Sequence, residues 1–228
     1  LIFVAYCLLG DLLPDALANR GFTPERMLRF QVFTTEGLFG APLGIAASVV
    51  FLFVLFGAFL EVTGAGKFFI NLAYAAAGHY RGGPAKAAVI ASAAMGSISG
   101  SAIANAVTSG AFTIPMMKKL GYRADQAAGI EAAASTGGQI MPPIMGAGAF
   151  IMAEFTNTPY STIIAVSFVP AALYFLGLLL FVHLMAVREG LKPMDAIAPV
   201  RETLKDGWHF IAPLVLITVL LILSFSPA

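Results

Sequence analysis

Two short polar interruptions lie inside otherwise apolar stretches of this sequence, and both are rich in oxygen-bearing groups. The first, Gly96–Asn105, contains three serines and two glycines. The second, Ser135–Pro143, contains a Ser-Thr pair, a Gly-Gly pair and a Pro-Pro pair. Hydroxyl and carbonyl oxygens are the ligands of hard cations, and a helix that begins at such a point directs unpaired N–H groups toward anions. The pattern predicts a site for a cation and an anionic substrate.

At the first interruption, one helix is expected to end and another to begin. A first arm at about 85–96 would end in unpaired carbonyls, and a second arm at about 102–110 would begin with unpaired N–H groups. Asn105 follows Ser101 by four residues, so both side chains can face one site. The alternative is that the two glycines, four residues apart, serve close helix packing.

The second interruption divides a helix predicted at about 124–155. The Gly-Gly pair at 137–138 permits conformations closed to other residues, and the Pro-Pro pair at 142–143 removes two N–H donors. Carbonyls at the start of the interruption are therefore expected to be free, beside the hydroxyls of Ser135 and Thr136. A simple proline kink is the alternative.

These two interruptions supply our predicted site residues. The cation is expected to bind at Ser97, Ser99, Gly100, Ser101, Ser135, Thr136, Gly137 and Gly138. The substrate is expected to bind at Ser101, Asn105, Thr136 and Gln139. We predict no catalytic residue and no transition-metal site, because the three histidines lie far apart and Cys7 is the only cysteine.

Three carboxylates in or near apolar segments are further candidates, because acids inside a membrane act as proton relays or cation ligands. Glu131 lies in the half-helix before the second interruption and is the one expected to be deep. Glu61 and Glu154 are expected near helix ends. The alternative for Glu131 is that it pairs with a neighbouring side chain or a backbone donor.

The composition predicts the elements that position these residues. The chain has 228 residues, of which 59% are hydrophobic and 11% charged, and its net charge is +1. Runs such as 43–60, 160–187 and 210–225 approach or exceed the roughly 18–20 residues that cross a bilayer. We therefore predict an all-α polytopic membrane protein in a lipid bilayer, and the charge gives no indication of nucleic-acid binding.

The chain is expected to have three parts. Residues 1–78 would contain membrane helices and an interfacial connecting helix. Residues 79–159 would form a core with the broken helix, a re-entrant hairpin at about 85–110 that enters and leaves on one side, and a separate short element at 113–122. Residues 160–228 would add two membrane helices that lead to a second half outside this chain. Neither end of the sequence is typical of a natural terminus, so a longer protein is expected.

The basic residues predict the orientation. If the hairpin is re-entrant, ten of the thirteen basic residues fall on the side of its base, and Arg20, Arg26 and Arg29 fall on the other. The positive-inside rule then places the base of the hairpin in the cytoplasm. The ten are Lys67, Arg81, Lys86, Lys118, Lys119, Arg123, Arg188, Lys192, Arg201 and Lys205.

Three stretches of the chain, 92–105, 113–122 and 131–149, closely resemble the large (DctM-like) membrane subunit of TRAP transporters, the tripartite ATP-independent periplasmic transporters. The sequence of residues 131–146 is most similar to the TAXI branch, in which the small and large membrane subunits are fused. The resemblance implies an elevator-type transporter built as an inverted repeat. This chain would be the first half of that repeat.

The resemblance also implies a function. The transporter would be a permease, not an enzyme, in the inner membrane of a bacterium or archaeon. It would import an organic anion, expected to be a carboxylate, with Na+ as the coupling ion, and a first sodium site would fall on 97–101 and 135–138. Its partners would be a periplasmic solute-binding protein of the TAXI type, a small membrane subunit or fused domain, and the second half of the large subunit.

Two other functions stay open. One is a sodium- or proton-coupled elevator carrier for carboxylates that works without a binding protein, and a neighbouring gene for a secreted binding protein would argue against it. The other is a channel or a structural membrane subunit. A channel would have polar residues along continuous helices, and these segments are mostly apolar.

Overall fold

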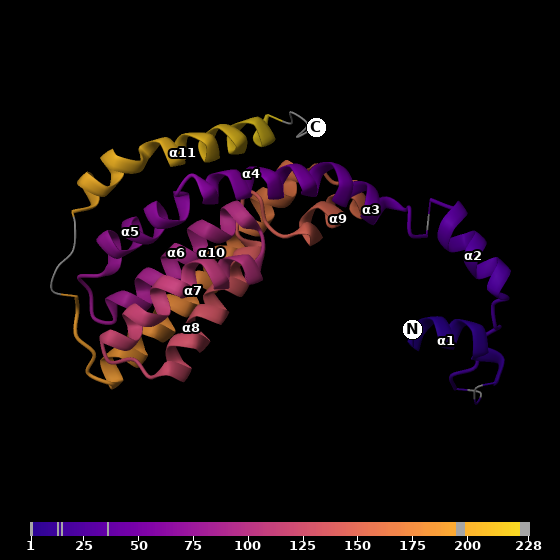
Figure 1. Ribbon diagram of the computed structural model, residues 1–228, viewed down its shortest axis with the longest axis horizontal. Helices are drawn as coiled ribbons and strands as arrows, with labels where there is room; N and C mark the ends of the chain where they lie inside the picture. Colours follow the sequence, from indigo (N-terminus) through magenta and orange to yellow (C-terminus); the bar gives the residue numbers. More distant parts are fainter. Residues whose placement is uncertain (1, 13, 15, 36, 195–198, 224–228) are drawn as a thin grey trace. The chain divides into compact units, whose positions relative to one another are not determined.

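The computed structural model describes residues 2–12, 14, 16–35, 37–194 and 199–223. Regular structure among these residues is helical, and no strand occurs in these ranges. The all-α prediction is confirmed. The chain forms two compact units, Leu1–Ser48 and Val49–Ala228, and the predicted site residues lie in the second (Figure 1).

The first unit consists of short helices. Thr23 ends the loop before α2, and its side chain accepts a hydrogen bond from the backbone N–H of Arg26 at 3.3 Å. Pro24 occupies the first turn, where its missing N–H costs nothing. The helices of this unit are α1 (Ile2–Leu9), η1 (Gly10–Leu12), α2 (Pro24–Phe33) and α3 (Ala41–Ile45).

Among the described residues, three helices are long and apolar enough to cross a membrane. The first, Ala41–Val62, has 22 residues and consists of α3, a π-helical turn (η2, Ala46–Val50) and α4 (Phe51–Val62). The others are α10 (Tyr160–Arg188, 29 residues) and α11 (Val200–Ile222, 23 residues). In the most apolar 18-residue stretch of each helix, only 11–17% is buried within the chain. Their outer faces therefore fit a lipid environment or further protein.

The core of the second unit surrounds α6 (Gly83–Ser99), which packs against five other α-helices in the described part of the chain (Figure 1). Ala85, Ala87, Ala88 and Ala91 have no exposed surface, and such small side chains let neighbouring backbones approach closely. These neighbours are α4, α5 (Ala65–Ala77), α7 (Ala102–Lys119), α8 (Ala124–Gly137) and α10.

The two helices α6 and α7 pack against each other and are joined by Gly100 and Ser101 alone. The predicted helix–tip–helix hairpin is confirmed as a pair of packed helices, and its re-entrant path through a membrane stays a prediction. The separate element expected at 113–122 is wrong, because α7 continues through Pro115 to Lys119. Met117 is fully buried in the main apolar cluster, so packing holds the last turns helical despite the proline.

The predicted break in the following helix is also confirmed. The first half, α8, ends at Gly137 and is followed by one 3₁₀ turn, η3 (Gly138–Ile140). The second half, α9, covers Ala147–Thr156. Residues 141–146 between them are not helical, and they contain a cis peptide bond between Pro142 and Pro143.

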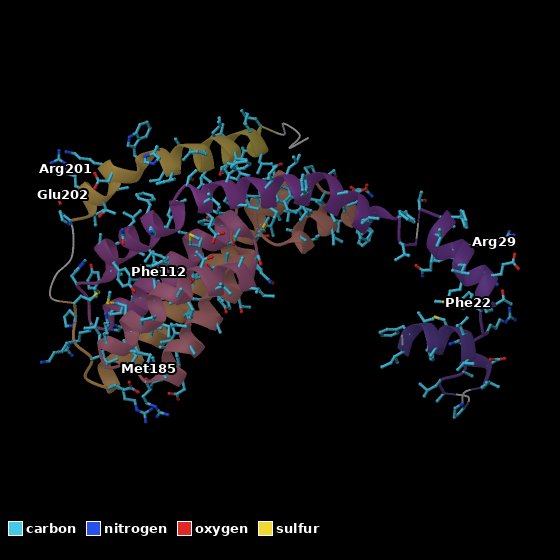
Figure 2. All side chains as sticks on the ribbon, in the orientation of Figure 1. Phe22, Arg29, Phe112, Met185, Arg201 and Glu202 are labelled. Atoms are coloured by element: carbon cyan, nitrogen blue, oxygen red, sulfur yellow. The ribbon has the colours of Figure 1, made fainter. Side chains whose placement is uncertain are left out.

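Helix α5 lies against one side of α6, and α11 packs against α5. The helix expected at the membrane interface is α5, and its buried residues Ile70, Ala73 and Ala77 form a cluster with α6. The last helix, α11, packs against α5 and begins with the charged residues Arg201 and Glu202 (Figure 2). An interfacial position for α5 stays a prediction.

Candidate functional site

The tip of the hairpin packs directly on the break of the next helix, with glycine backbone on both sides. A β-carbon on Gly96 would lie 2.2 Å from the Cα atom of Gly138, and one on Gly100 would lie 1.8 Å from the carbonyl oxygen of Met145. Gly100 also has a φ angle of 60°, which side chains rarely tolerate. The structure therefore brings the two predicted interruptions together into one region.

The serines of the tip make local hydrogen bonds. Ser101 is the N-cap of α7, where its hydroxyl oxygen accepts a bond from the N–H of Ala104 at 3.3 Å. The hydroxyl of Ser99 accepts a bond from the N–H of Ser101 at 3.4 Å. Ser97 donates to the carbonyl of Ala94 at 2.7 Å. Each hydroxyl oxygen has a second lone pair, so these bonds are compatible with a cation bound beside them.

The break has a more regular backbone than the sequence predicts. Gly137 and Gly138 have helical φ angles of −60° and −58°, so neither needs the conformations that only glycine adopts. The predicted reason for the Gly-Gly pair is therefore wrong. A β-carbon on Gly137 would lie 2.4 Å from the ring of Tyr174, and one on Gly138 would lie 2.8 Å from Gly96. Both glycines are required by close approach.

The carbonyls of the break are partly engaged. Gly138 donates its N–H to the carbonyls of Ser135 and Thr136, and the carbonyl of Gly138 accepts a bond from Met141 at 3.2 Å. The carbonyl of Gln139 accepts the N–H of Gly146 at 2.7 Å. The carbonyls of Ser135, Thr136 and Gly138 were expected to be free, whereas that of Gln139 was not part of the prediction. Since a carbonyl oxygen has two lone pairs, each retains one for a cation.

The predicted substrate residues lie at different depths. Asn105 is 1% exposed, and its amide donates to the carbonyl of Ser92 at 2.9 Å. The side chains of Thr136 and Gln139 lie on the exposed surface of the break, where Thr136 donates to the carbonyl of Ala132 at 2.7 Å. Asn105 therefore supports the tip from the hairpin interior, whereas Thr136 and Gln139 are accessible to a ligand.

A buried polar cluster lies next to this region, centred on Glu131. This carboxylate is 2% exposed, and in the described part of the chain no basic side chain forms an ion pair with it. Its Oε1 atom accepts hydrogen bonds from Ser92 and Ser135, both at 3.1 Å, and from Ser109. Its Oε2 atom accepts a bond from Thr113. We call these five residues the Glu131 cluster.

The sequence contains a signal for this cluster that the predicted site did not include. Asn105, Ser109 and Thr113 follow Ser101 at steps of four residues, which puts one polar stripe along α7. A polar stripe on a helix of a membrane protein must face protein or water rather than lipid. Combined with a lone acid at 131, it predicts a contact between α7 and α8.

Two tyrosines of α10 were also not predicted. The hydroxyl of Tyr160 donates to the carbonyls of Pro143 at 2.9 Å and Ile144 at 2.7 Å. The hydroxyl of Tyr174 donates to the carbonyl of Ala133 at 2.8 Å. Tyr160 therefore bonds α10 to the unwound segment, and Tyr174 bonds α10 to the last turns of α8. Their acceptors are distant in sequence, and a tyrosine in a long apolar helix is not by itself a signal.

The two remaining acids lie outside the Glu131 cluster. Glu61 accepts a hydrogen bond from the hydroxyl of Thr108 on α7. Glu154 lies on an exposed position of α9. In the ranges that the structure describes, no three His, Cys, Asp or Glu side chains are close enough to hold a metal ion together.

Comparisons with known proteins agree on one family. The sequence profile described as "Tripartite ATP-independent periplasmic transporter, DctM component" matches residues 2–228. The C4-dicarboxylate TRAP transporter large permease protein DctM of Pseudomonas aeruginosa is 31% identical over 211 residues, which are 92% of this chain and 47% of that protein. The sialic acid TRAP transporter permease protein SiaT of Haemophilus influenzae is 28% identical over 178 residues, 77% of this chain and 29% of that protein. The 2,3-diketo-L-gulonate TRAP transporter large permease protein YiaN of Escherichia coli is 35% identical over 91 residues, 40% of this chain and 21% of that protein. The chain thus spans about half the length of these curated relatives, or less.

Proposed function

Because the chain belongs to the DctM family of tripartite ATP-independent periplasmic transporters, we propose that it is the first half of a large permease subunit that imports an organic anion together with Na+. The helices long enough to span a membrane agree with a permease. The relatives are named for C4-dicarboxylate, sialic acid and 2,3-diketo-L-gulonate. These names support a carboxylate as the substrate class.

The observation that carries this proposal is the direct contact between the hairpin tip and the helix break. Gly96 packs against the backbone of Gly138, and Gly100 packs against the carbonyl of Met145. Neither contact leaves room for a side chain on the glycine of the tip. This contact supports one shared site for hydroxyl and carbonyl oxygens of both elements. Oxygen ligands in such a set suit a hard cation.

The cation would be held by the oxygens of the tip and of the first turn of the break. The same residues were predicted from the sequence, and a hydroxyl or carbonyl oxygen that accepts one hydrogen bond keeps a second lone pair for a cation. The proposed ligands are Ser97, Ser99, Gly100, Ser101, Ser135, Thr136, Gly137 and Gly138.

The anion would bind beside the cation, at the start of α7. A helix N-terminus carries a partial positive charge, and Ser101 marks this one. Thr136 and Gln139 on the exposed side of the break would complete the contacts from this chain. Asn105 would act from beneath, by supporting the first turn of α7. The other half of the subunit would supply the remaining contacts.

We extend the proposal to partners and topology. The hairpin would be re-entrant with its base in the cytoplasm, and the core would move as an elevator. A periplasmic solute-binding protein of the TAXI type would deliver the anion, and a small membrane subunit, separate or fused, would complete the transporter. The family match supports the binding protein and the small subunit as partners. The TAXI assignment rests on the sequence of 131–146.

The test is uptake by the complete transporter in liposomes. Uptake of a labelled carboxylate is expected to follow an imposed Na+ gradient and to require the solute-binding protein encoded beside it. A proton gradient that drives uptake without sodium would contradict the cation assignment. Uptake at the full rate without any binding protein would favour the carrier of the alternative class.

A further inference from the structure

Glu131 contacts both arms of the hairpin and the half-helix before the break. Its carboxylate accepts hydrogen bonds from Ser92 on α6, from Ser109 and Thr113 on α7, and from Ser135 on its own helix. Among the residues that the structure describes, no other charged side chain is buried to this degree. A buried carboxylate is costly unless its lone pairs are satisfied, so four donors at one carboxylate constitute a built arrangement.

The Glu131 cluster adjoins the proposed cation site and shares Ser135 with it. Ser92 precedes Gly96 by four residues, and Gly96 is the glycine that touches Gly138. Ser135 precedes Gly138 by three residues. Ser135 bonds to Glu131 within α8, so it is the bond from Ser92 to Glu131 that fixes how far α6 and α8 are shifted along each other at the tip–break contact.

A carboxylate is suited to this task because it accepts four hydrogen bonds and donates none. The hydroxyls on α7 have competing acceptors on their own helix. Ser109 also reaches the carbonyl of Asn105 at 2.6 Å, and Thr113 reaches the carbonyl of Ser109 at 3.0 Å. Without a charged acceptor on α8, these hydroxyls would bond back to α7 and the link between the helices would be lost.

We propose that Glu131 is a positioning residue for the cation site: its carboxylate holds both hairpin arms and the broken helix in the register that brings the oxygens of tip and break together. The inference rests on the proposed function, because the site that Glu131 positions is the one assigned there. Glu131 itself does not touch the cation. It acts through Ser92 on α6 and through Ser109 and Thr113 on α7.

The decisive experiment uses a pair of substitutions at Thr113 in the complete transporter. Thr113→Val keeps the shape and removes the hydroxyl, whereas Thr113→Ser keeps the hydroxyl and removes a methyl group. If Thr113 only fills space, serine is the damaging change. If its hydrogen bond to Glu131 positions the site, valine is the damaging change.

We expect Thr113→Val to raise the Na+ concentration for half-maximal uptake about tenfold, the loss expected for a hydrogen bond to a charged group. Thr113→Ser should keep the wild-type value. The KM for substrate at saturating Na+ should be the same in both variants, because the register is restored when the cation is bound.

Glu131→Gln provides a second measurement. The amide keeps the volume but offers one oxygen acceptor and an NH₂ group, which cannot accept from Thr113. The half-maximal Na+ concentration should rise at least as much as in Thr113→Val. Glu154→Gln, the same change at an exposed position of α9, is the matched control and should leave it unchanged. Melting temperatures of all purified variants show whether they are folded.

The outcomes separate this inference from the proposed function. Wild-type sodium dependence in Thr113→Val and Glu131→Gln, with only a lowered melting temperature, would reduce the Glu131 cluster to a stabilising role and overturn the inference. If the wild-type protein itself proves indifferent to Na+, the proposed function fails. The Thr113 pair is then judged on half-saturation by substrate, and equal values for valine and serine overturn the positioning role as well. If Glu131→Gln does not fold, the Thr113 pair alone decides.

Discussion

The hairpin tip and the Glu131 cluster are neighbours along α6, where Ser92 precedes Gly96 by four residues, and they are built in opposite ways. At the tip, backbone meets backbone through Gly96 and Gly138, and the serine hydroxyls bond within their own loop or helix. In the Glu131 cluster, side chains meet across three helices, and the central carboxylate is 2% exposed. The tip therefore has close fit with few bonds between elements, whereas the cluster has several such bonds.

This difference indicates separate tasks. An interface with few hydrogen bonds between its two sides can open and close at low energetic cost, as a ligand site must. A network of charge-assisted hydrogen bonds is costly to break. The three helices that the Glu131 cluster joins, α6, α7 and α8, would then move together, while local rearrangement is confined to the tip and the break. Four changes test this division, from the largest expected effect to the smallest.

The largest effect is expected for Gly100→Ala. The β-carbon would lie 1.8 Å from the carbonyl oxygen of Met145, and the φ angle of 60° would be strained for alanine. Strain and overpacking together should cost about 2–5 kcal/mol and abolish uptake. Unfolding and uptake measurements on the complete transporter check this. The control is Gly148→Ala on α9, where the new methyl group meets nothing and stability should rise by up to about 1 kcal/mol.

The next effect distinguishes the two glycines of the break. Gly138→Ala would push on the backbone of Gly96, which cannot move aside, and Gly137→Ala would push on the ring of Tyr174. We expect Gly138→Ala to cost about 1–3 kcal/mol through overpacking and to lower the affinities for Na+ and substrate together. Equilibrium binding of both ligands measures this. Normal Na+ binding by a destabilised Gly138→Ala protein would mean that the cation site lies elsewhere.

A smaller effect is expected for Ser101→Ala. The substitution removes the N-cap of α7, which should cost about 0.5–2 kcal/mol, and it removes a proposed ligand of both the cation and the substrate. Ser101→Thr keeps a capping hydroxyl and serves as the control. Uptake kinetics beside the melting temperature separate the two losses. If both variants transport like the wild type, the tip serves packing alone.

The smallest effect on stability is expected for Ser97→Ala. The hydroxyl of Ser97 bonds back to the carbonyl of Ala94 on its own helix, and such bonds contribute little to helix stability. The unfolding free energy should change by less than about 0.5 kcal/mol. A raised half-maximal Na+ concentration in a protein of unchanged stability would identify Ser97 as a ligand. An unchanged one would remove it from the proposed set.

The hairpin and the break could be predicted from the sequence, because glycines, serines and a Pro-Pro pair interrupt an apolar helix through local effects on the backbone. The length of α7 could not. Pro115 is a local signal for an end, and the burial of Met117, which overrides it, depends on helices distant in sequence. The polar face of α7 that meets Glu131 could have been found from the spacing of Asn105, Ser109 and Thr113, whereas Ser92 has no such signal and meets Glu131 only after the hairpin folds.

The contact between Gly96 and Gly138 has a consequence for the rate at which the site can work. Most surfaces that pack together must freeze side-chain rotamers, at a cost of up to about 2 kcal/mol for each long side chain. Glycines have no rotamers to freeze, so this contact forms and separates without that entropy loss. The contact between the two glycine backbones can therefore open and close repeatedly, and the ligands bound at the site determine which of the two arrangements is favoured.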